Sequence, residues 1–190
     1  LSILILMSNQ RVFLELFGDS ESVGIFQFYF FIATGFPNLF EATLYSFILP
    51  RLALKNKNNK RKKIKISIKE KFYLISSSTF FLILIFYLLD YIIGFVGKPE
   101  LVDFKNIYFY LSIYSLLHIN FRIKFMNFYS ANKDYFLLRT QIITLFLSLI
   151  FSVLLVKQFN IYGAAISLVF SGIIENFIIN LANNNKNNTI

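Results

Sequence analysis

The sequence predicts an all-α integral membrane protein, a bundle of six transmembrane helices, and three observations lead to this fold class. Hydrophobic residues make up 56% of the 190-residue chain and charged residues 15%, whereas a soluble domain has about 25% charged residues. The apolar residues form long continuous runs and lack the period-two alternation of a membrane β-barrel. Because backbone polar groups in lipid must bond within the chain, these runs are expected to be helical.

Each of the six runs is compared with the length that a membrane crossing needs, about 20 residues for a hydrocarbon core of about 30 Å. The expected helices cover approximately residues 1–17, 23–50, 72–95, 105–121, 139–157 and 161–182. Together they make one six-helix membrane domain, residues 1–182, and the Asn-rich residues 183–190 are expected to form a polar cytoplasmic tail.

The runs differ in how well they suit a lipid environment. The third, fifth and sixth reach the required length without strain. The second is long enough to tilt, and Gly35 and Pro37 predict a kink near its middle. The first is apolar but contains Arg11 and Glu15, and the fourth is short and ends in polar residues.

The segment Arg51–Lys71 orients the other segments, because it holds ten of the chain's 19 basic residues. The positive-inside rule places this loop in the cytoplasm. Counting crossings from it puts the acidic residues 18–22 outside, the basic residues 122–138 inside, and both chain ends in the cytoplasm. The net charge of +9 therefore indicates anionic lipid headgroups as partners. No nucleic-acid recognition motif accompanies it.

Signals of catalysis are lacking in the sequence. There is no cysteine and a single histidine, so neither a disulfide nor a thiolate metal site can form. No phosphate-binding glycine loop, HExxH or GxSxG motif occurs. We expect no enzyme, no metal and no cofactor other than a coupling proton or sodium ion. The abrupt apolar opening at Leu1 leads us to expect a fragment of a longer protein.

Ionisable residues inside the apolar runs are the main functional signal. Each costs about 2.5–3.5 kcal/mol at a helix centre, so such residues usually face the protein interior or a wet cavity. Glu41 and Glu175 lie near the middle of their runs and are candidate ion-coupling or cavity acids. Arg11 lies about 10 Å from the outer end of its run, at 1.5 Å per residue. A structural ion pair or helix contact is the alternative for all three.

A polar stripe recurs every four residues on the fourth run, at Tyr110, Tyr114, His118 and Arg122. Such spacing places these side chains nearly on one helical face. Aromatic rings and a guanidinium suit a ligand that bears sugars and phosphate. Tyr114, His118 and Arg122 therefore join Arg11 as candidate substrate-cavity residues. Simple anchoring at the membrane interface is the alternative for Arg122.

A second four-residue stripe lies on the sixth run, at Gly163, Ser167, Ser171 and Glu175. Small residues allow helices to approach closely in a membrane. Packing is the expected purpose of this stripe, and it brings Glu175 into the bundle interior.

Three short motifs resemble those of the polysaccharide and O-antigen repeat-unit flippases, within the MATE-like superfamily of oligosaccharidyl-lipid exporters. The motifs are Asn9–Leu14 with Gly18 and Val23–Phe26, then Phe47–Pro50 before the basic loop, then Asn160–Ala165. Two positions depart from the family pattern. Gln10 stands where the family often has Asp, and Asn160 stands where it has Gly.

The resemblance implies one half, the second, of a twelve-helix transporter in the bacterial cytoplasmic (inner) membrane. It implies translocation of undecaprenyl-pyrophosphate-linked oligosaccharide by alternating access, for O-antigen or capsular polysaccharide synthesis. Arg11 is the residue that falls on a family motif, as a cavity cation. The missing N-terminal half or a second copy of the chain would be its partner. The alternatives are a MATE-type ion-coupled small-molecule exporter and a non-transporting membrane fragment.

Overall fold

The computed structural model describes residues 2–58, 66–131 and 133–184, and every element among them is helical. The predicted all-α fold class is therefore confirmed. The elements are α1 Ser2–Phe17, α2 Ser20–Thr43, a π-helix Leu44–Ile48, α3 Leu49–Asn58, α4 Ile68–Val96, a 3₁₀ helix Pro99–Phe104, α5 Lys105–Tyr129 and α6 Asp134–Asn184.

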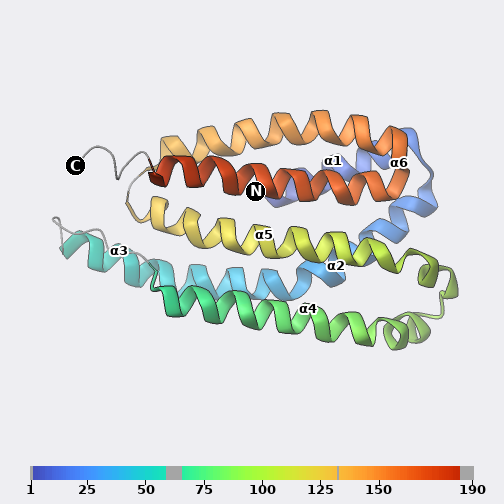
Figure 1. The fold of residues 1–190 in the computed structure, drawn as a ribbon, viewed down its shortest axis with the longest axis horizontal. Coiled ribbons are helices and arrows are strands. Elements are labelled where there is room, and N and C mark those ends of the chain that lie inside the picture. The colour runs from blue at the N-terminus through green and yellow to red at the C-terminus, as the bar shows by residue number, and fades with distance from the viewer. Residues whose placement is uncertain (1, 59–65, 132, 185–190) are drawn as a thin grey trace.

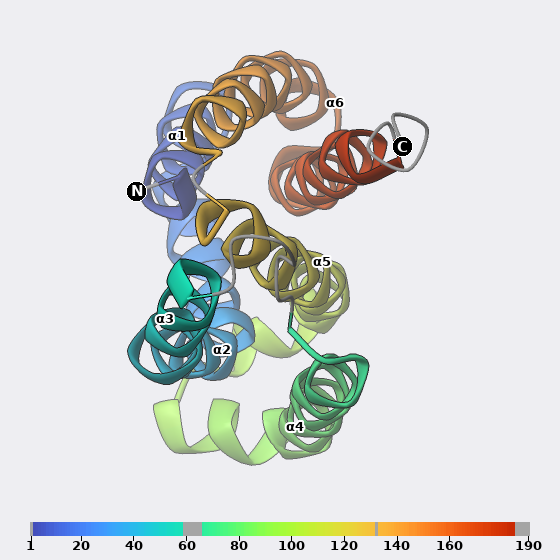
Figure 2. The same ribbon diagram turned by 90° about the vertical axis from the view of Figure 1, so that its left-hand side faces the viewer.

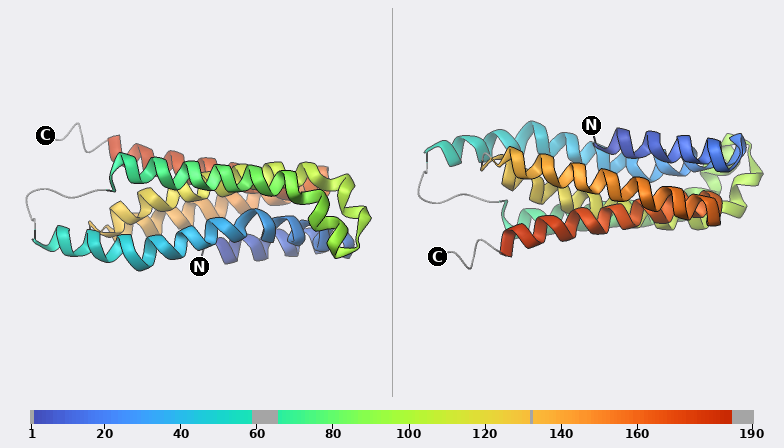
Figure 3. Two further views of the ribbon diagram at one scale, coloured as in Figure 1. Left: turned by 90° about the horizontal axis from the view of Figure 1, so that it is seen from below. Right: turned by 90° about the horizontal axis from the view of Figure 1, so that it is seen from above.

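The helices lie along one common axis and form an elongated bundle (Figures 1 and 3). Viewed end-on, α5 lies at the centre, with α2 and α4 on one side and α6 on the other (Figure 2). Contacts between α5 and each of these three helices agree with this placement. The position of α5 explains why its buried residues are spread around its circumference, including polar ones.

Long segments of the bundle carry the expected membrane-compatible composition. Three stretches are long and apolar enough to cross a membrane, Ser20–Leu52, Ile68–Val96 and Asp134–Ala182. The 16 residues of α1 extend only about 24 Å at 1.5 Å per residue. The 25 residues of α5 are long enough, but α5 is not among these three stretches.

The longest stretch, α6, is a helical hairpin. Asn160 has φ 49° and ψ −126°, a non-helical conformation that reverses the chain. The arms 134–159 and 161–184 lie side by side and run in opposite directions (Figures 1 and 2). The ring of Phe151 on one arm stacks on the ring of Phe170 on the other, with the ring centroids 5.3 Å apart. The chain turn thus falls at the site expected between the fifth and sixth runs.

The end of α5 corrects one expectation. Residues 122–138 were expected to form a loop, but α5 continues to Tyr129 and α6 begins at Asp134. The added turns bury Ile123 and Met126 against neighbouring helices. A prediction from hydrophobicity alone ends this helix where its polar residues begin. In the structure the helix continues, because its apolar face is buried while its polar residues lie on other faces.

Local hydrogen bonds set several helix ends. The Asp19 carboxylate accepts a 2.6 Å hydrogen bond from the Ser22 N–H at the start of α2, and this bond lowers the pKa of the Asp19 carboxyl from its ordinary value. At the start of α4 the Ser67 N–H donates to the Glu70 carboxylate at 3.0 Å. Gly97 ends α4 in the left-handed conformation, with φ 73°.

Pro37 lies inside α2, where it cannot donate a hydrogen bond to the Ala33 carbonyl four residues earlier. Ser115 of α5 replaces that donor, since its hydroxyl donates to Ala33 O at 2.9 Å. The irregularity that follows is the π-helix Leu44–Ile48. A side chain of the central helix thus satisfies the backbone group that proline leaves free.

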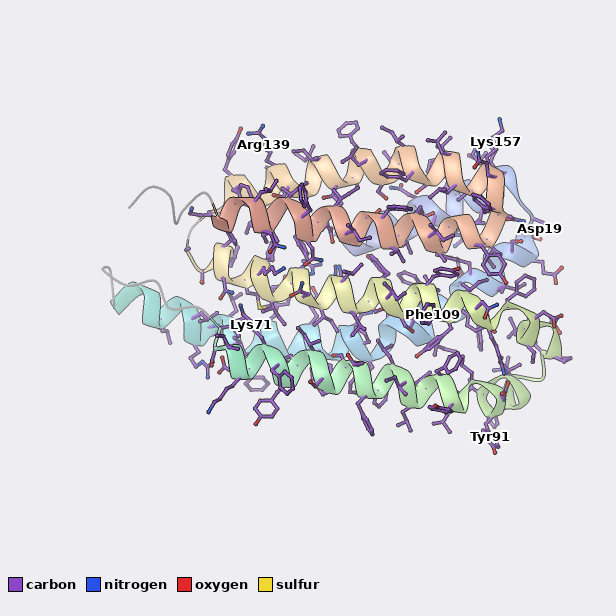
Figure 4. All side chains as sticks on the ribbon, viewed as in Figure 1. Asp19, Lys71, Tyr91, Phe109, Arg139 and Lys157 are labelled. Carbon is purple, nitrogen blue, oxygen red and sulfur yellow. The ribbon has the colours of Figure 1, made fainter. Side chains whose placement is uncertain are left out.

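The two ends of the bundle differ in charge. Lys71 and Arg139 lie toward one end, and Asp19, Lys157 and Tyr91 lie toward the other (Figure 4). We call the first the basic end. The second is the end where the α6 hairpin turns, and we call it the Asn160 end. Because successive helices alternate in direction, Arg51 also belongs to the basic end.

The turn of the α6 hairpin depends on Gly163, and substitution there tests the packing. A Cβ at Gly163 would lie 2.0 Å from Leu155 O, so we expect Gly163→Ala to lower the free energy of unfolding by about 1–3 kcal/mol. Gly35→Ala is the control, because nothing lies within 4 Å of its added Cβ. Denaturation in detergent micelles, followed by circular dichroism, measures both. Equal stability of the two variants would contradict the packed turn.

Candidate functional site

Five of the six candidate site residues come together in the bundle interior: Glu41 of α2, Tyr114, His118 and Arg122 of α5, and Glu175 of α6. The His118 imidazole lies between two carboxylates, with Nε2 3.6 Å from Glu41 Oε2 and Nδ1 3.8 Å from Glu175 Oε2. Arg122 Nε lies 3.0 Å from Glu41 Oε1 and 3.1 Å from His118 Nε2. We call Glu41, His118, Arg122 and Glu175 the ionic cluster.

The ionic cluster lies deep in the molecule. The side chains of His118, Arg122 and Glu175 are 4%, 6% and 1% exposed, and that of Glu41 is 19% exposed. His118 also lies near the middle of α5, about 20 Å from Lys105 and about 16 Å from Tyr129 at 1.5 Å per residue. Burial at this depth makes neighbouring protein groups the main partners of these charges.

The aromatic neighbours complete the surroundings of the cluster. The Tyr114 ring lies 5.8 Å from the His118 ring, between centroids, and its buried hydroxyl has no hydrogen-bond partner among the described residues. Arg122 Nη1 donates to the Tyr45 hydroxyl at 3.4 Å, and its guanidinium lies 5.6 Å from the centre of the Phe125 ring. The phenols and the guanidinium therefore lie within one layer of the bundle.

Asn176 fixes the position of Glu175 relative to α5. Its amide donates to Leu117 O at 2.8 Å and accepts from Asn120 Nδ2 at 2.8 Å. One turn earlier, Gly172 allows α6 to approach α5 closely, because a Cβ added at this position would lie only 3.1 Å from Leu117 Cβ. These contacts join the second arm of α6 to the central helix, beside the cluster.

The charges in the cluster are nearly balanced. Two carboxylates and one guanidinium give a formal charge of −1 when His118 is neutral, and one proton on the imidazole brings it to zero. In a low-dielectric interior a balanced set is strongly favoured over a net charge. A change in the charge of any one of these groups would therefore act on α2, α5 and α6 together.

Arg11 is not part of the cluster. Its side chain is 58% exposed on α1 and pairs with Glu15 one turn later, with Nε 2.9 Å from Oε1. The structure thus leaves this candidate on an outer face of the chain.

A groove of about 520 Å³ lies between α4 and α5, and it is apolar apart from a few hydroxyls. Ser112 and Tyr108 contribute to its wall, but no member of the ionic cluster does. The groove and the cluster are therefore separate features of α5.

Sequence reasoning did not select Tyr45 or Asn176 as neighbours of the cluster, and it did not find the partner of the α1 residue Gln10. Gln10 is fully buried and its amide donates to Ser152 Oγ at 2.6 Å, across α1 and α6. The sequence does contain a pattern that marks Ser152, the partner of Gln10, because hydroxyl residues recur every four positions from Thr140 to Ser152. Tyr45 and Asn176 have no comparable pattern, and only the folded arrangement brings them to the cluster.

Comparison of the chain with family models, with curated proteins and with solved structures finds no match. The arrangement of the ionic cluster is therefore the basis for assigning a function.

The pairing of Arg122 with Glu41 can be tested by a double-mutant cycle. Arg122→Gln leaves the largely buried Glu41 carboxylate without its guanidinium, so we expect a loss of about 3–5 kcal/mol of folding free energy. Adding Glu41→Gln restores the balance, and the double variant should lose less than the sum of the single variants. Detergent unfolding curves give the three values.

Arg51→Gln is the matched control, because it breaks the more exposed pair of Arg51 with Glu70 and should cost about 1 kcal/mol or less. Additive single losses at Glu41 and Arg122 would rule out the proposed coupling.

Proposed function

We propose that the chain is a half-unit of an ion-coupled membrane exporter, in which the ionic cluster binds the coupling proton. The observation that carries this proposal is His118, placed between carboxylates from two other helices at mid-depth of the bundle. Ionisable groups at such a depth are costly and are characteristic of proton relays and ion pathways in transporters. A structural role alone requires only the pair of Glu41 with Arg122.

The proposed unit has six crossings, made by α1, the continuous segment 20–58, α4, α5 and the two arms of α6. The hydropathy of α5 is lower than that of the outer helices α2, α4 and α6. A central helix can still cross the membrane, because its polar side chains contact other helices and not lipid. The basic end would face the cytoplasm of a bacterial inner membrane, with both chain ends on that side. A second six-helix unit, from the same chain or another copy, would cover the exposed Arg11.

The proposed substrate is a lipid-linked oligosaccharide, flipped from the cytoplasmic to the periplasmic leaflet for surface polysaccharide synthesis. The flippase-like motifs support this substrate. Protonation of His118 would draw Glu41 and Glu175 toward the imidazole, and its loss would release them. Because α2, α5 and α6 carry these groups, such a change would alter their packing and provide alternating access.

A small-molecule exporter of the MATE type is the second candidate, and the excess of acids in the cluster favours it. The cluster contains two carboxylates and one guanidinium, and this excess of negative charge suits cationic compounds better than a pyrophosphate. Deletion strains separate the two functions. Loss of surface polysaccharide supports the flippase, and a gain in susceptibility to cationic drugs at normal polysaccharide supports the second candidate.

The role of His118 is tested by His118→Gln, which keeps the size and polarity of the side chain but cannot bind the proton. We expect export of surface polysaccharide to fall at least about a hundredfold, the scale of a positioned proton-transfer group. Tyr110→Phe, on the same helix and outside the cluster, is the control. Polysaccharide is quantified in cells with matched amounts of protein. Normal export by His118→Gln would refute proton coupling at this site.

The role of Arg11 is tested separately with Arg11→Ala. Because its guanidinium is exposed and would face the second unit, we expect loss of export with no change in the amount of protein. Glu15→Ala removes the partner of Arg11 and leaves the guanidinium free, so it should retain export. Unchanged polymer with Arg11→Ala would show that Arg11 does not contact the substrate.

A further inference from the structure

Two columns of buried hydroxyl groups run along the α6 hairpin. In each column the residues are spaced four positions apart, which places them on one face of their arm. The columns consist of Thr140, Thr144, Ser148 and Ser152 on the first arm, and Ser167 and Ser171, continued by Glu175, on the second.

The columns face each other. Ser152 Oγ lies 3.4 Å from Ser167 Oγ. Since the arms are antiparallel, one turn further along brings Ser148 level with Ser171, and the next turn brings Thr144 level with Glu175. The hydroxyls therefore lead to the carboxylate that faces His118.

Several buried polar atoms in this region make no hydrogen bond among the described residues, although Glu175 Oε2 lies 3.8 Å from His118 Nδ1. Gln10 Oε1, Ser148 Oγ and Glu175 Oε2 are buried and lack a hydrogen-bond partner among the described residues. Leaving such a group unpaired costs about 1–3 kcal/mol. In the second column, Ser167 and Ser171 donate to carbonyls of their own arm. Ser167 also accepts from Ser152, and each hydroxyl retains a lone pair for a further donor. Close packing of helices requires small side chains but gains nothing from unpaired acceptors.

The ends of the columns differ. Toward the basic end, a groove of about 350 Å³ is lined by Arg139 and Thr140, so it reaches the first hydroxyl of the first column. Toward the Asn160 end, the buried side chains of Leu14 and Val156 follow Ser152. The columns are therefore approached from the basic end and closed by apolar side chains at the other.

We propose that these columns and Gln10 hold a file of water molecules that carries protons from the basic end to Glu175 and His118. We call this the hydroxyl track. The two columns and the neighbouring Gln10 provide three buried acceptors that make no hydrogen bond among the described residues, and buried water needs several such polar partners. In each transfer one O–H bond breaks as the next forms. The last proton binds a Glu175 oxygen or His118 Nδ1, with no change in oxidation state.

The groups that face His118 also limit where the proton stops. Glu41 of α2 and Glu175 of α6 attract it, whereas Arg122 of α5 repels it. Tyr114 of α5 lies beside the ring with its hydroxyl unpaired. The inference rests on the proposed coupling role of the ionic cluster, and it adds the path and the side of entry.

The test uses cysteine accessibility, because the chain has no cysteine of its own. Ser152→Cys and Ser171→Cys keep the size of the side chain. Leu168→Cys is the control, because Leu168 is equally buried and lies on the same arm as Ser171. Inside-out and right-side-out membrane vesicles are treated with silver ions. Unreacted thiols are then alkylated after denaturation and counted by mass spectrometry.

We expect both serine-derived cysteines to react at least about tenfold faster than Leu168→Cys, a difference of about 1.4 kcal/mol in access. Reaction should be faster when the basic end faces the silver solution. Equal protection at all three positions, or faster entry from the Asn160 end, would overturn the hydroxyl track. If silver reacts with the thiols more slowly in a sodium buffer than in a choline buffer, sodium competes for the same path. That result would overturn the proton as the transferred ion and assign the site to sodium.

Failure of this inference is distinguishable from failure of the proposed function. If the cysteines are protected while His118→Gln still abolishes export, the track is wrong and the coupling role stands. If the cysteines react while export is normal in His118→Gln, water reaches the cluster without driving transport.

Discussion

The structure depends on the charges that α5 places at the centre of an apolar bundle. Arg122 and His118 are buried, so each must find its partners on neighbouring helices. Glu41 provides them from α2 and Glu175 from α6. These contacts fix which faces of three helices meet, because a rotation of any of them would leave a charge alone in a low-dielectric interior. The surrounding apolar side chains add area and little orientation.

The polar interior also explains how the irregular backbone is tolerated. Ser115 satisfies the Ala33 carbonyl that Pro37 leaves free, and the phenol of Tyr108 donates to Leu82 O at 2.9 Å. Asn176 bonds to Leu117 O beside the ionic cluster. Each of these side chains joins two helices by a hydrogen bond to a backbone carbonyl. In a membrane, where apolar contacts between helices compete with equally apolar lipid, such bonds supply much of the specificity.

Sequence reasoning located most helical segments because long apolar runs leave few alternatives in lipid. It failed at the end of α5, where Ile123 and Met126 are buried but alternate with basic and polar residues. For the site, membrane depth selected Glu41 and Glu175, and four-residue spacing selected Tyr114, His118 and Arg122. Spacing works within one helix, since it depends only on helical geometry. It says nothing about partners on other helices, which is why Tyr45 and Asn176 were missed.

The sequence by itself determined that the chain is helical, that it has stretches of membrane-crossing length, and that a few ionisable residues lie within them. Composition and local periodicity are properties of the chain, and lipid restricts what they can form. Only the tertiary structure decided which of those residues meet. It joined Glu41, His118 and Glu175 from three helices, reversed the chain at Asn160, and left Arg11 on an outer face. These outcomes depend on how helices rotate and pack against one another, and pairwise burial of charge decides that packing.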